Sequence, residues 1–201
     1  GRPPDDVLAP RALRAFLGTR HVGDLAPAAL PSQLAHAAVT QRHCGACGSE
    51  MAPGEQPLER RCPRCDRTTY PAIAPCVITL AYDEHDRILM TRAPHFPPGM
   101  YGLCAGFVEP GESLETTAKR ELFEETGLVV SDVRYVGSQP WPFPSQLIVG
   151  SEPRIVSGTL RVDERELESA ALFAPDELPP LPPPFSIARH LIDAFLARRG
   201  R

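Results

Sequence analysis

The chain has 201 residues and a formal net charge of −4, with 42% hydrophobic and 23% charged residues. This composition is typical of a globular protein with one full domain and room for a small module. The acidic balance provides no overall basic field for nucleic acid. The longest apolar runs, such as residues 76–82, suit a buried strand and are too short for a membrane span, so no membrane partner is expected. The first residues show no signal-peptide pattern.

The first 40 or so residues are predicted to be helical and punctuated by proline. Pro10 could open one helix, and Pro31 with Ser32 could open a second helix through residues 33–39. We treat residues 1–42 as an N-terminal segment, and its sequence indicates no function.

Residues 43–70 hold two C-x-x-C pairs, Cys44 with Cys47 and Cys62 with Cys65, which are separated by 14 residues. This is the spacing of a structural zinc site, in which four thiolates close a tetrahedron and leave no open position for catalysis. Two disulfides or unrelated thiols are the alternative, and the paired spacing favours zinc. Because four of the six cysteines are paired in this way, we expect a reducing compartment such as the cytoplasm.

Four arginines surround the second cysteine pair: Arg60, Arg61, Arg64 and Arg67. They could form a patch that contacts phosphate or RNA. They could equally offset the negative charge of a zinc–tetrathiolate site or be solvated, and we favour this second interpretation. Cys76 and Cys104 lie in strand-like contexts and are expected to be buried as small apolar residues.

Residues 71–201 alternate between strand and helix patterns without a regular βαβ rhythm. Predicted strands cover residues 73–82, 87–90, 103–108, 129–136, 146–149 and 155–162. Predicted helices cover residues 113–126, which Gly127 should end in a left-handed conformation, and 187–198. Residues 93–101 and the proline-rich residues 178–184 are predicted loops. This order favours an α/β (α+β) fold with a mixed sheet between helices.

Residues 106–128 fit the pattern G-x5-E-x7-R-E-U-x-E-E-x-G-U, in which U is aliphatic, at nine fixed positions across 23 residues. On a helix that advances 100° per residue, Glu125 falls within the apolar stripe of Leu114, Ala118 and Leu122, and Glu121 lies one turn earlier. An inward carboxylate is costly unless it is neutralised. Two such carboxylates on adjacent turns suit a hard divalent cation.

Arg120 and Glu124 are four residues apart on another face, where an ion pair could position Glu124. The alternative for the whole motif is a surface helix with scattered acids, which the fixed glycines and arginine disfavour. Mg²⁺ or Mn²⁺ held here could neutralise a pyrophosphate and activate a water molecule, while a carboxylate accepts its proton. No serine or cysteine nucleophile is required.

Residues 138–144 read Ser-Gln-Pro-Trp-Pro-Phe-Pro. Proline at every second position stiffens the backbone and excludes an interior strand. Trp141 and Phe143 are therefore held on a rigid frame, where they could stack on a flat ring or anchor an interface. By residue chemistry alone, a packed loop is an equal alternative.

Residues 106–128 resemble the Nudix box. Together with the four-cysteine module and the Pro-Trp-Pro-Phe-Pro segment, the chain from about Cys44 onward resembles the NADH pyrophosphatase family of Nudix hydrolases. The resemblance implies a zinc ribbon over residues 43–70 and a Nudix α/β/α sandwich over residues 71–201. It also implies hydrolysis of NAD(H) to nicotinamide mononucleotide (NMN or NMNH) and AMP. Members can remove NAD caps from RNA 5′ ends, and they often act as homodimers whose active site uses both chains.

The resemblance also implies roles for individual residues. Glu121 and Glu125 would ligate Mg²⁺ or Mn²⁺, with the carbonyl of Ala105 and the carboxylate of Glu166 as further ligands, for which Glu168 is the nearby competitor. Glu124 would be a catalytic carboxylate or a ligand, beside Arg120 of the box. Phe107 would stack on the nicotinamide ring. The other implied substrate contacts are Tyr70, Gln139, Pro140, Trp141, Pro142, Phe143, Pro144, Ser145, Gln146 and Ala188.

Two features depart from the family pattern. The third motif usually continues with one variable residue and then serine, whereas this chain has Ser145 and then Gln146, which bears on fine specificity. The segment before the ribbon is shorter than the usual N-terminal domain, so a truncated domain is one interpretation. Arg14 could match a substrate-contacting arginine there. A regulator that binds NAD or ADP-ribose without cutting it is the alternative function, which the intact carboxylate set disfavours.

Overall fold

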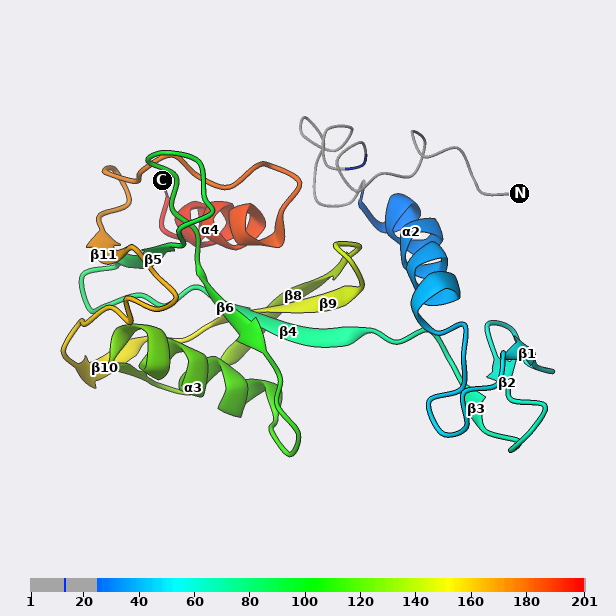
Figure 1. Cartoon of the computed structure of the whole chain (residues 1–201). Coiled ribbons are helices and arrows are strands. Elements are labelled where there is room, and N and C mark those ends of the chain that lie inside the picture. Colours follow the sequence, from blue (N-terminus) through cyan, green and yellow to red (C-terminus); the bar gives the residue numbers. More distant parts are fainter. Residues whose placement is uncertain (1–12, 14–24, 201) are drawn as a thin grey trace.

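The computed structural model describes residue 13 and residues 25–200. Helix α2 (Leu25–Thr40) comes first and leads into a small antiparallel sheet of three short strands, β1 (Ala52–Pro53), β2 (Arg60–Arg61) and β3 (Thr68–Thr69). The two ends of this ribbon lie close together, because the backbone N–H of Ala72 donates a hydrogen bond to Gln41 Oε1 at 3.3 Å. The ribbon therefore projects beside α2 at one end of the molecule (Figure 1).

The main sheet has four strands in the order β6 (Cys104–Phe107), β4 (Ala74–Thr79), β9 (Gln146–Glu152) and β8 (Arg134–Trp141). Strands β4 and β9 are parallel, whereas the β4–β6 and β8–β9 pairs are antiparallel. Two further antiparallel pairs join β5 (Ile88–Arg92) to β11 (Ser169–Phe173) and β7 (Leu128–Val130) to β10 (Ile155–Gly158). The predicted mixed sheet is confirmed.

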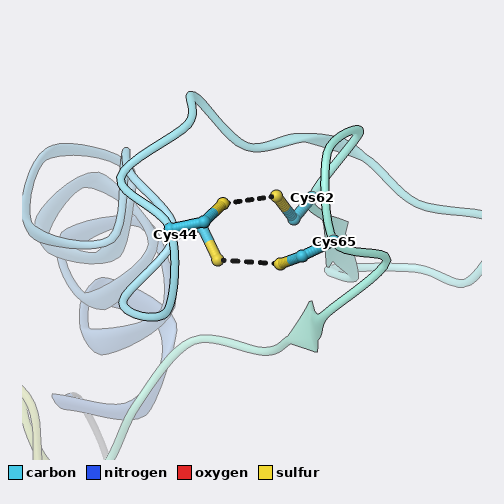
Figure 2. A group of neighbouring side chains, drawn as sticks. Cys44, Cys62 and Cys65 are labelled. Atoms are coloured by element: carbon cyan, nitrogen blue, oxygen red, sulfur yellow. Dashed lines mark hydrogen bonds between the residues drawn. The ribbon is translucent and has the colours of Figure 1, made fainter.

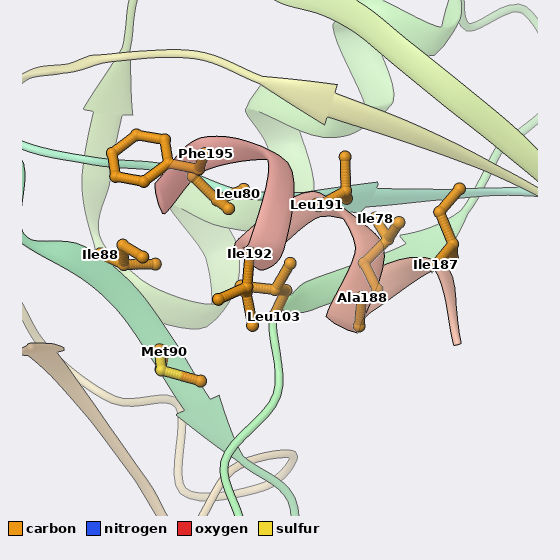
Figure 3. Packing of buried hydrophobic residues seen from close by; sticks show 10 residues of the cluster. All are labelled: Ile78, Leu80, Ile88, Met90, Leu103, Ile187, Ala188, Leu191, Ile192 and Phe195. Carbon is orange, nitrogen blue, oxygen red and sulfur yellow. The ribbon is translucent and has the colours of Figure 1, made fainter. Parts of the chain in front are cut away.

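Helices α3 (Leu114–Thr126) and α4 (Ile187–Arg198) cover opposite faces of the main sheet (Figure 1). Leu191, Ile192 and Phe195 of α4 are fully buried and point toward the strands, where they meet residues such as Leu80 and Met90 (Figure 3). Such apolar burial is the main force that holds the layers together. The α/β/α arrangement predicted from the sequence is therefore the observed fold.

Both sandwich helices begin and end where the sequence predicts. Ser113 caps α3 by accepting a hydrogen bond from the backbone N–H of Thr116 at 3.2 Å, and Ser186 caps α4 in the same way. Gly127 ends α3 with φ at 71°, and its N–H donates to Phe123 O at 2.8 Å. These local signals fix the register of α3, which decides which carboxylates face inward.

The predicted start of the N-terminal helix is wrong. α2 begins at Leu25, and Pro31 lies inside it. Leu25 is completely buried in a cluster with Phe185, Trp141 and Phe143, so tertiary packing extends the helix past a proline that local propensity would place at its start. Pro10 and Arg14 lie outside the described residues.

Several predicted strands are also corrected. Residues 129–136 form two strands, β7 and β8, because Ser131 leaves the strand path to exchange hydrogen bonds with Arg154. Strand β11 was not predicted, because its sequence Ser-Ala-Ala-Leu-Phe has no alternating pattern and it forms by pairing with β5. The proline segment behaves as predicted, since Pro140 lies on β8 at the edge of the main sheet.

We predict that Gly127→Ala lowers the free energy of unfolding by about 2 kcal/mol, because φ is positive there and an added methyl would lie 2.9 Å from Thr159 O. Urea unfolding would measure the loss. Gly99→Ala is the matched control, because its φ is 76° but its added methyl meets open space, so it isolates the backbone cost. Equal losses in the two variants would show that crowding at Gly127 has no effect.

Candidate active site

The four paired cysteines form a compact cluster in the ribbon. Their sulfur atoms all lie within 4.8 Å of one another, with Cys44 and Cys65 at 3.6 Å and Cys47 and Cys62 at 3.5 Å (Figure 2). A tetrahedral zinc ion with bonds of about 2.3 Å requires sulfur atoms about 3.8 Å apart, so the cluster fits zinc. None of these cysteines is disulfide-bonded. A backbone hydrogen bond at Ser49 lowers the pKa of Cys47 to about 6, which favours its thiolate form.

The arginines around the ribbon fall into two groups. Arg60 Nη2 donates to Met51 O at 2.6 Å, and Arg61 forms two hydrogen bonds with the carboxylate of Asp66 at 2.5 and 2.8 Å. Arg64 and Arg67 are exposed and form no ion pair within the described part of the chain. Half of the set therefore has a structural role, and the other half faces solvent.

Glu125 lies on the buried side of α3, as the periodicity predicts. Its side chain is 6% exposed, beside the fully buried Leu122 and Ala118. Burial raises its pKa to about 7, and the nearby charges of Glu121 and Glu166 act in the same direction. Among the described residues its Oε2 has no hydrogen-bond donor. A buried carboxylate oxygen without a partner fits a divalent cation as its missing partner.

Gly106 of β6 makes room for Glu121 of α3. A Cβ atom at this position would overlap with the carboxyl group of Glu121. The motif glycine is therefore required by the close approach of the strand to the helix, a reason that the sequence pattern alone did not supply. Burial also raises the pKa of Glu121.

Arg120 organises the carboxylates of the motif. It forms ion pairs with Glu112 at 2.6 Å, Glu121 at 2.9 Å and Glu124 at 3.1 Å. Its Nη2 also donates to Phe107 O at 3.0 Å. The predicted Arg120–Glu124 pair is confirmed. The pair with Glu112 was missed, although Glu112 is a fixed motif position, and Arg120 lowers the pKa of Glu112 to about 2.

Two clefts meet beside the carboxyl end of α3. A polar cleft of about 640 Å³ lies over the end of α3, and an apolar cleft of about 410 Å³ lies on the α4 side of the sheet. Glu125 and Glu166 line both clefts. The predicted site residues Ala105, Trp141 and Ala188 line the apolar cleft. The structure therefore joins acidic groups to an apolar pocket able to hold a ring.

The structure distinguishes Glu166 from its competitor Glu168. Glu168 pairs with Arg92 at 2.8 Å and lines neither cleft, whereas Glu166 lines both. The three predicted carboxylate ligands are more widely spaced than the cysteines. Within residues 25–200, only the cysteine group brings three or more ligand atoms within 4.8 Å of one another. The metal roles of Glu121, Glu125 and Glu166 stay predictions.

Three other residues predicted to contact the substrate form hydrogen bonds within the protein. Gln139 is buried, donates to Phe185 O at 2.7 Å and accepts from the N–H of Ile187 at 2.9 Å, which positions the start of α4. Ser145 Oγ donates to Ala72 O at 2.9 Å. Gln146 O accepts a hydrogen bond from Gln33 Nε2 at 3.3 Å. Their substrate roles stay predictions.

The remaining predicted contacts are aromatic side chains and prolines. Phe107 and Tyr70 line neither cleft. Their side chains are 51% and 53% exposed, so both rings are accessible for stacking on a substrate ring. Phe143 packs against Trp141, which stacks on Phe185 at a centroid distance of 5.9 Å. The prolines of the segment, Pro140, Pro142 and Pro144, line neither cleft.

Two loops in the apolar cleft were not predicted as part of the site. Residues 93–101 contribute His95 and Phe96, and the segment after residue 181 contributes Pro182 and Phe185. Both segments were predicted as loops from their prolines. That composition gave no signal that the two loops line the same cleft.

The chain matches two known families over consecutive segments. Residues 72–195 match the family described as the NUDIX domain, and residues 40–70 match the NADH pyrophosphatase zinc ribbon domain. The motif at residues 106–128 and the four cysteines lie within these matches.

Similar proteins include several named NAD-capped RNA hydrolase NudC. The protein from Pseudomonas aeruginosa is 45% identical over 169 residues, which cover 84% of this chain and 60% of the relative. The protein from Chromobacterium violaceum is 41% identical over 180 residues, which cover 90% of this chain and 68% of the relative. The chain thus spans about 60% of the length of the Pseudomonas relative.

Solved structures share the fold at low identity. A NUDIX hydrolase from Nitrosomonas europaea has a TM-score of 0.65 and 24% identity, covering 79% of this chain and 93% of that chain. The NUDIX domain of Shewanella oneidensis NrtR, solved with ADP ribose, has a TM-score of 0.52 and 18% identity, covering 66% and 91%. Separately, no helix within the described residues combines the length and apolar character needed to cross a membrane.

We predict that Cys62→Ser releases the ribbon zinc and lowers the stability of the protein, because a broken four-cysteine site loses its contribution to folding. Metal analysis of the purified variant would measure bound zinc, and thermal unfolding would measure stability. Cys76→Ser is the control, because it replaces a buried thiol in β4 and should retain zinc. Full zinc content in Cys62→Ser would contradict the assignment.

We predict that Glu125→Gln stabilises the protein at alkaline pH when no Mg²⁺ or Mn²⁺ is added. Because the pKa of Glu125 is about 7 in the folded protein and its ordinary value is 4.5, the unfolded chain loses this proton first. Stability therefore falls as pH rises from about 4.5 to 7 and is lowest above 7. Glu125→Gln has no carboxyl proton to lose at this position, so its stability does not show this decrease with pH. Its free energy of unfolding relative to wild type should rise by about 2 kcal/mol between about pH 5.5 and 8.

Urea unfolding at several pH values would test this dependence. Glu115→Gln is the control, because hydrogen bonds at the start of α3 lower the pKa of Glu115. This carboxylate is charged in both the folded and the unfolded chain above about pH 5.5, so the effect of the variant on stability should not change up to pH 8. A difference between wild type and Glu125→Gln that does not change with pH would show that Glu125 is not a destabilised buried acid.

Proposed function

We propose that this chain, which belongs to the NUDIX family and carries an NADH pyrophosphatase zinc ribbon, hydrolyses the pyrophosphate bond of NAD(H) to nicotinamide mononucleotide and AMP. The observation that carries the proposal is the meeting of the two clefts at Glu125 and Glu166. A dinucleotide needs this combination, because its pyrophosphate requires a charged centre and its bases require an apolar pocket.

The carboxylates of α3 would hold the cation on which the reaction depends. Glu125 offers a buried oxygen without a donor, and Glu121 and Glu166 add negative charge close enough to raise the pKa of Glu125. The carbonyl of Ala105 would complete the set. When bound, Mg²⁺ or Mn²⁺ neutralises the pyrophosphate and acidifies a water molecule.

The remaining motif residues would orient the groups and move the proton. Arg120 holds Glu121 and Glu124 through ion pairs at 2.9 and 3.1 Å, so neither carboxylate is free to swing away. Glu124, which lines the polar cleft, would accept the proton of the attacking water. Attack of that oxygen on one phosphorus breaks the P–O–P bond and yields two monophosphates.

The apolar cleft supports a nucleotide as the substrate. Trp141 and Phe185 supply aromatic faces on one side, and Phe96 supplies another. The names of the NudC relatives point to the same NAD group at the end of an RNA chain. Removal of NAD caps from RNA is therefore the second candidate function, for which the exposed Arg64 and Arg67 are available as phosphate contacts.

Three further expectations accompany the proposal. The site could be completed by a second copy of the chain in a homodimer, which sedimentation or gel filtration would test. The free cysteines suit a reducing compartment, so we place the protein in the cytoplasm. Regulation without cleavage, by binding NAD or ADP-ribose, is the alternative if no metal supports turnover.

We predict that Glu125→Gln lowers turnover of NADH by at least about a hundredfold, because removal of the charge weakens the cation site. Chromatography would separate reduced nicotinamide mononucleotide and AMP after incubation with Mg²⁺ or Mn²⁺. Glu115→Gln is the matched control, an acid on the exposed side of the same helix that lines neither cleft. A fully active Glu125→Gln protein would contradict the assignment.

The same assay would separate the two substrates. A short RNA with a 5′ NAD cap, offered beside free NADH, should be favoured at low salt only if the chain contacts its phosphates. If Arg64→Gln removes that preference and leaves NADH turnover unchanged, RNA is the substrate that the ribbon recognises. Equal use of both substrates at all salt concentrations would show that the protein recognises the dinucleotide itself and not the RNA chain attached to it.

A further inference from the structure

Arg92, the last residue of β5, is the centre of a group of hydrogen bonds outside the metal motif. Its side chain is 15% exposed. Nε donates to Glu168 Oε2 at 2.8 Å, Nη1 donates to Pro97 O at 2.5 Å and Met100 O at 3.0 Å, and Nη2 donates to Phe96 O at 3.1 Å. One guanidinium therefore binds a carboxylate and three carbonyls at once, which only its planar fork of donors allows.

The three carbonyls belong to residues 93–101, which form one wall of the apolar cleft. The cleft-lining residues of this loop are Ala93, His95, Phe96 and Met100. The loop contains Pro94, Pro97 and Pro98, which have no N–H to donate. Within the loop, the N–H groups of Phe96 and Met100 donate to Ala93 O and Pro97 O, and Arg92 adds further donors to the loop carbonyls.

The carboxylate belongs to the segment that carries Glu166. Besides its ion pair, Glu168 donates its backbone N–H to Arg92 O at 2.8 Å, and the β5–β11 pairing begins at the next residue, Ser169. Glu166 and Leu167 of this segment line the apolar cleft. Arg92 thus connects two of the segments that line the apolar cleft.

We propose that Arg92 is a positioning residue for substrate recognition. It fixes the loop of residues 93–101 against the Glu166 segment and so sets the width of the apolar cleft. This proposal rests on the proposed function, because it takes the apolar cleft as the binding site of a dinucleotide ring. Trp141, on a further wall, would contact the same ring. A surface ion pair with no such role is the alternative.

The chain offers a matched control for that alternative. Arg87 lies just before β5 and pairs with Asp83 at 2.7 Å, with a further hydrogen bond from its backbone N–H to Asp83 Oδ1 at 2.9 Å. It lines neither cleft. Arg87→Lys therefore reports the general effect of replacing a paired arginine beside this strand.

The kinetic experiment compares Arg92→Lys with Arg87→Lys. Lysine keeps the charge opposite Glu168, but its single ammonium cannot span three carbonyls. We expect the KM for NADH to rise about tenfold in Arg92→Lys, the effect of losing one charge-assisted hydrogen bond, with kcat within about threefold of wild type. Arg87→Lys should leave both constants unchanged.

A second readout needs no turnover. Trp141 is the only tryptophan of the chain, so its fluorescence reports on the apolar cleft. NAD⁺ titrated without added divalent metal should bind Arg92→Lys about tenfold more weakly than wild type, matching the KM. In the absence of ligand, acrylamide should quench Trp141 more strongly in Arg92→Lys, because another wall of the cleft that Trp141 lines is no longer fixed and the quencher enters the cleft more easily.

The outcomes separate this proposal from the proposed function. If quenching, NAD⁺ affinity and KM are the same in Arg92→Lys and wild type, the positioning role is overturned. It is also overturned if Arg87→Lys shows the same changes. If the wild-type protein cleaves no dinucleotide, the proposed function fails, and the quenching comparison alone still decides whether Arg92 holds the cleft wall.

Discussion

The structure depends above all on one costly placement, the carboxylate of Glu125 on the buried side of α3. The helix has little freedom to avoid it. Ser113 and Gly127 fix where α3 begins and ends, and Ala118 and Leu122 fix which side enters the core. A carboxylate in that position raises the free energy of the metal-free protein and draws a cation toward it. Instability at this point and the metal affinity that we propose for it have the same physical origin.

The residues around Glu125 pair with its neighbouring carboxylates and leave the charge of Glu125 itself unpaired. Arg120 neutralises Glu112 and reaches Glu121 and Glu124, but it does not bond to Glu125. Gly106 lets the strand approach closely enough for Glu121 to lie against its backbone. Glu125 and Glu166, the two carboxylates at the junction of the two clefts, therefore form no ion pair within the described part of the chain.

The sequence predicted the parts of the molecule that local rules determine. Helix caps, the inward face of α3, the mixed sheet and the zinc-binding cysteines each follow from residue spacing that is read over a few turns. It failed where distant packing decides. Leu25 extends α2 because of Phe185, and β11 exists because β5 is its partner. Likewise, Gln139 was predicted as a substrate contact, and only the fold reveals its bonds to Phe185 and Ile187.

The hydrogen bond between Gln41 and Ala72 joins the point where the chain enters the ribbon to the point where it leaves. A segment inserted in this way can be shortened or exchanged with little effect on its flanks, because Gln41 and Ala72 are already joined. The ribbon and the sandwich can therefore evolve at different rates, and a short turn in place of residues 43–70 would give a ribbonless protein in which α2 still packs on the aromatic wall of the cleft.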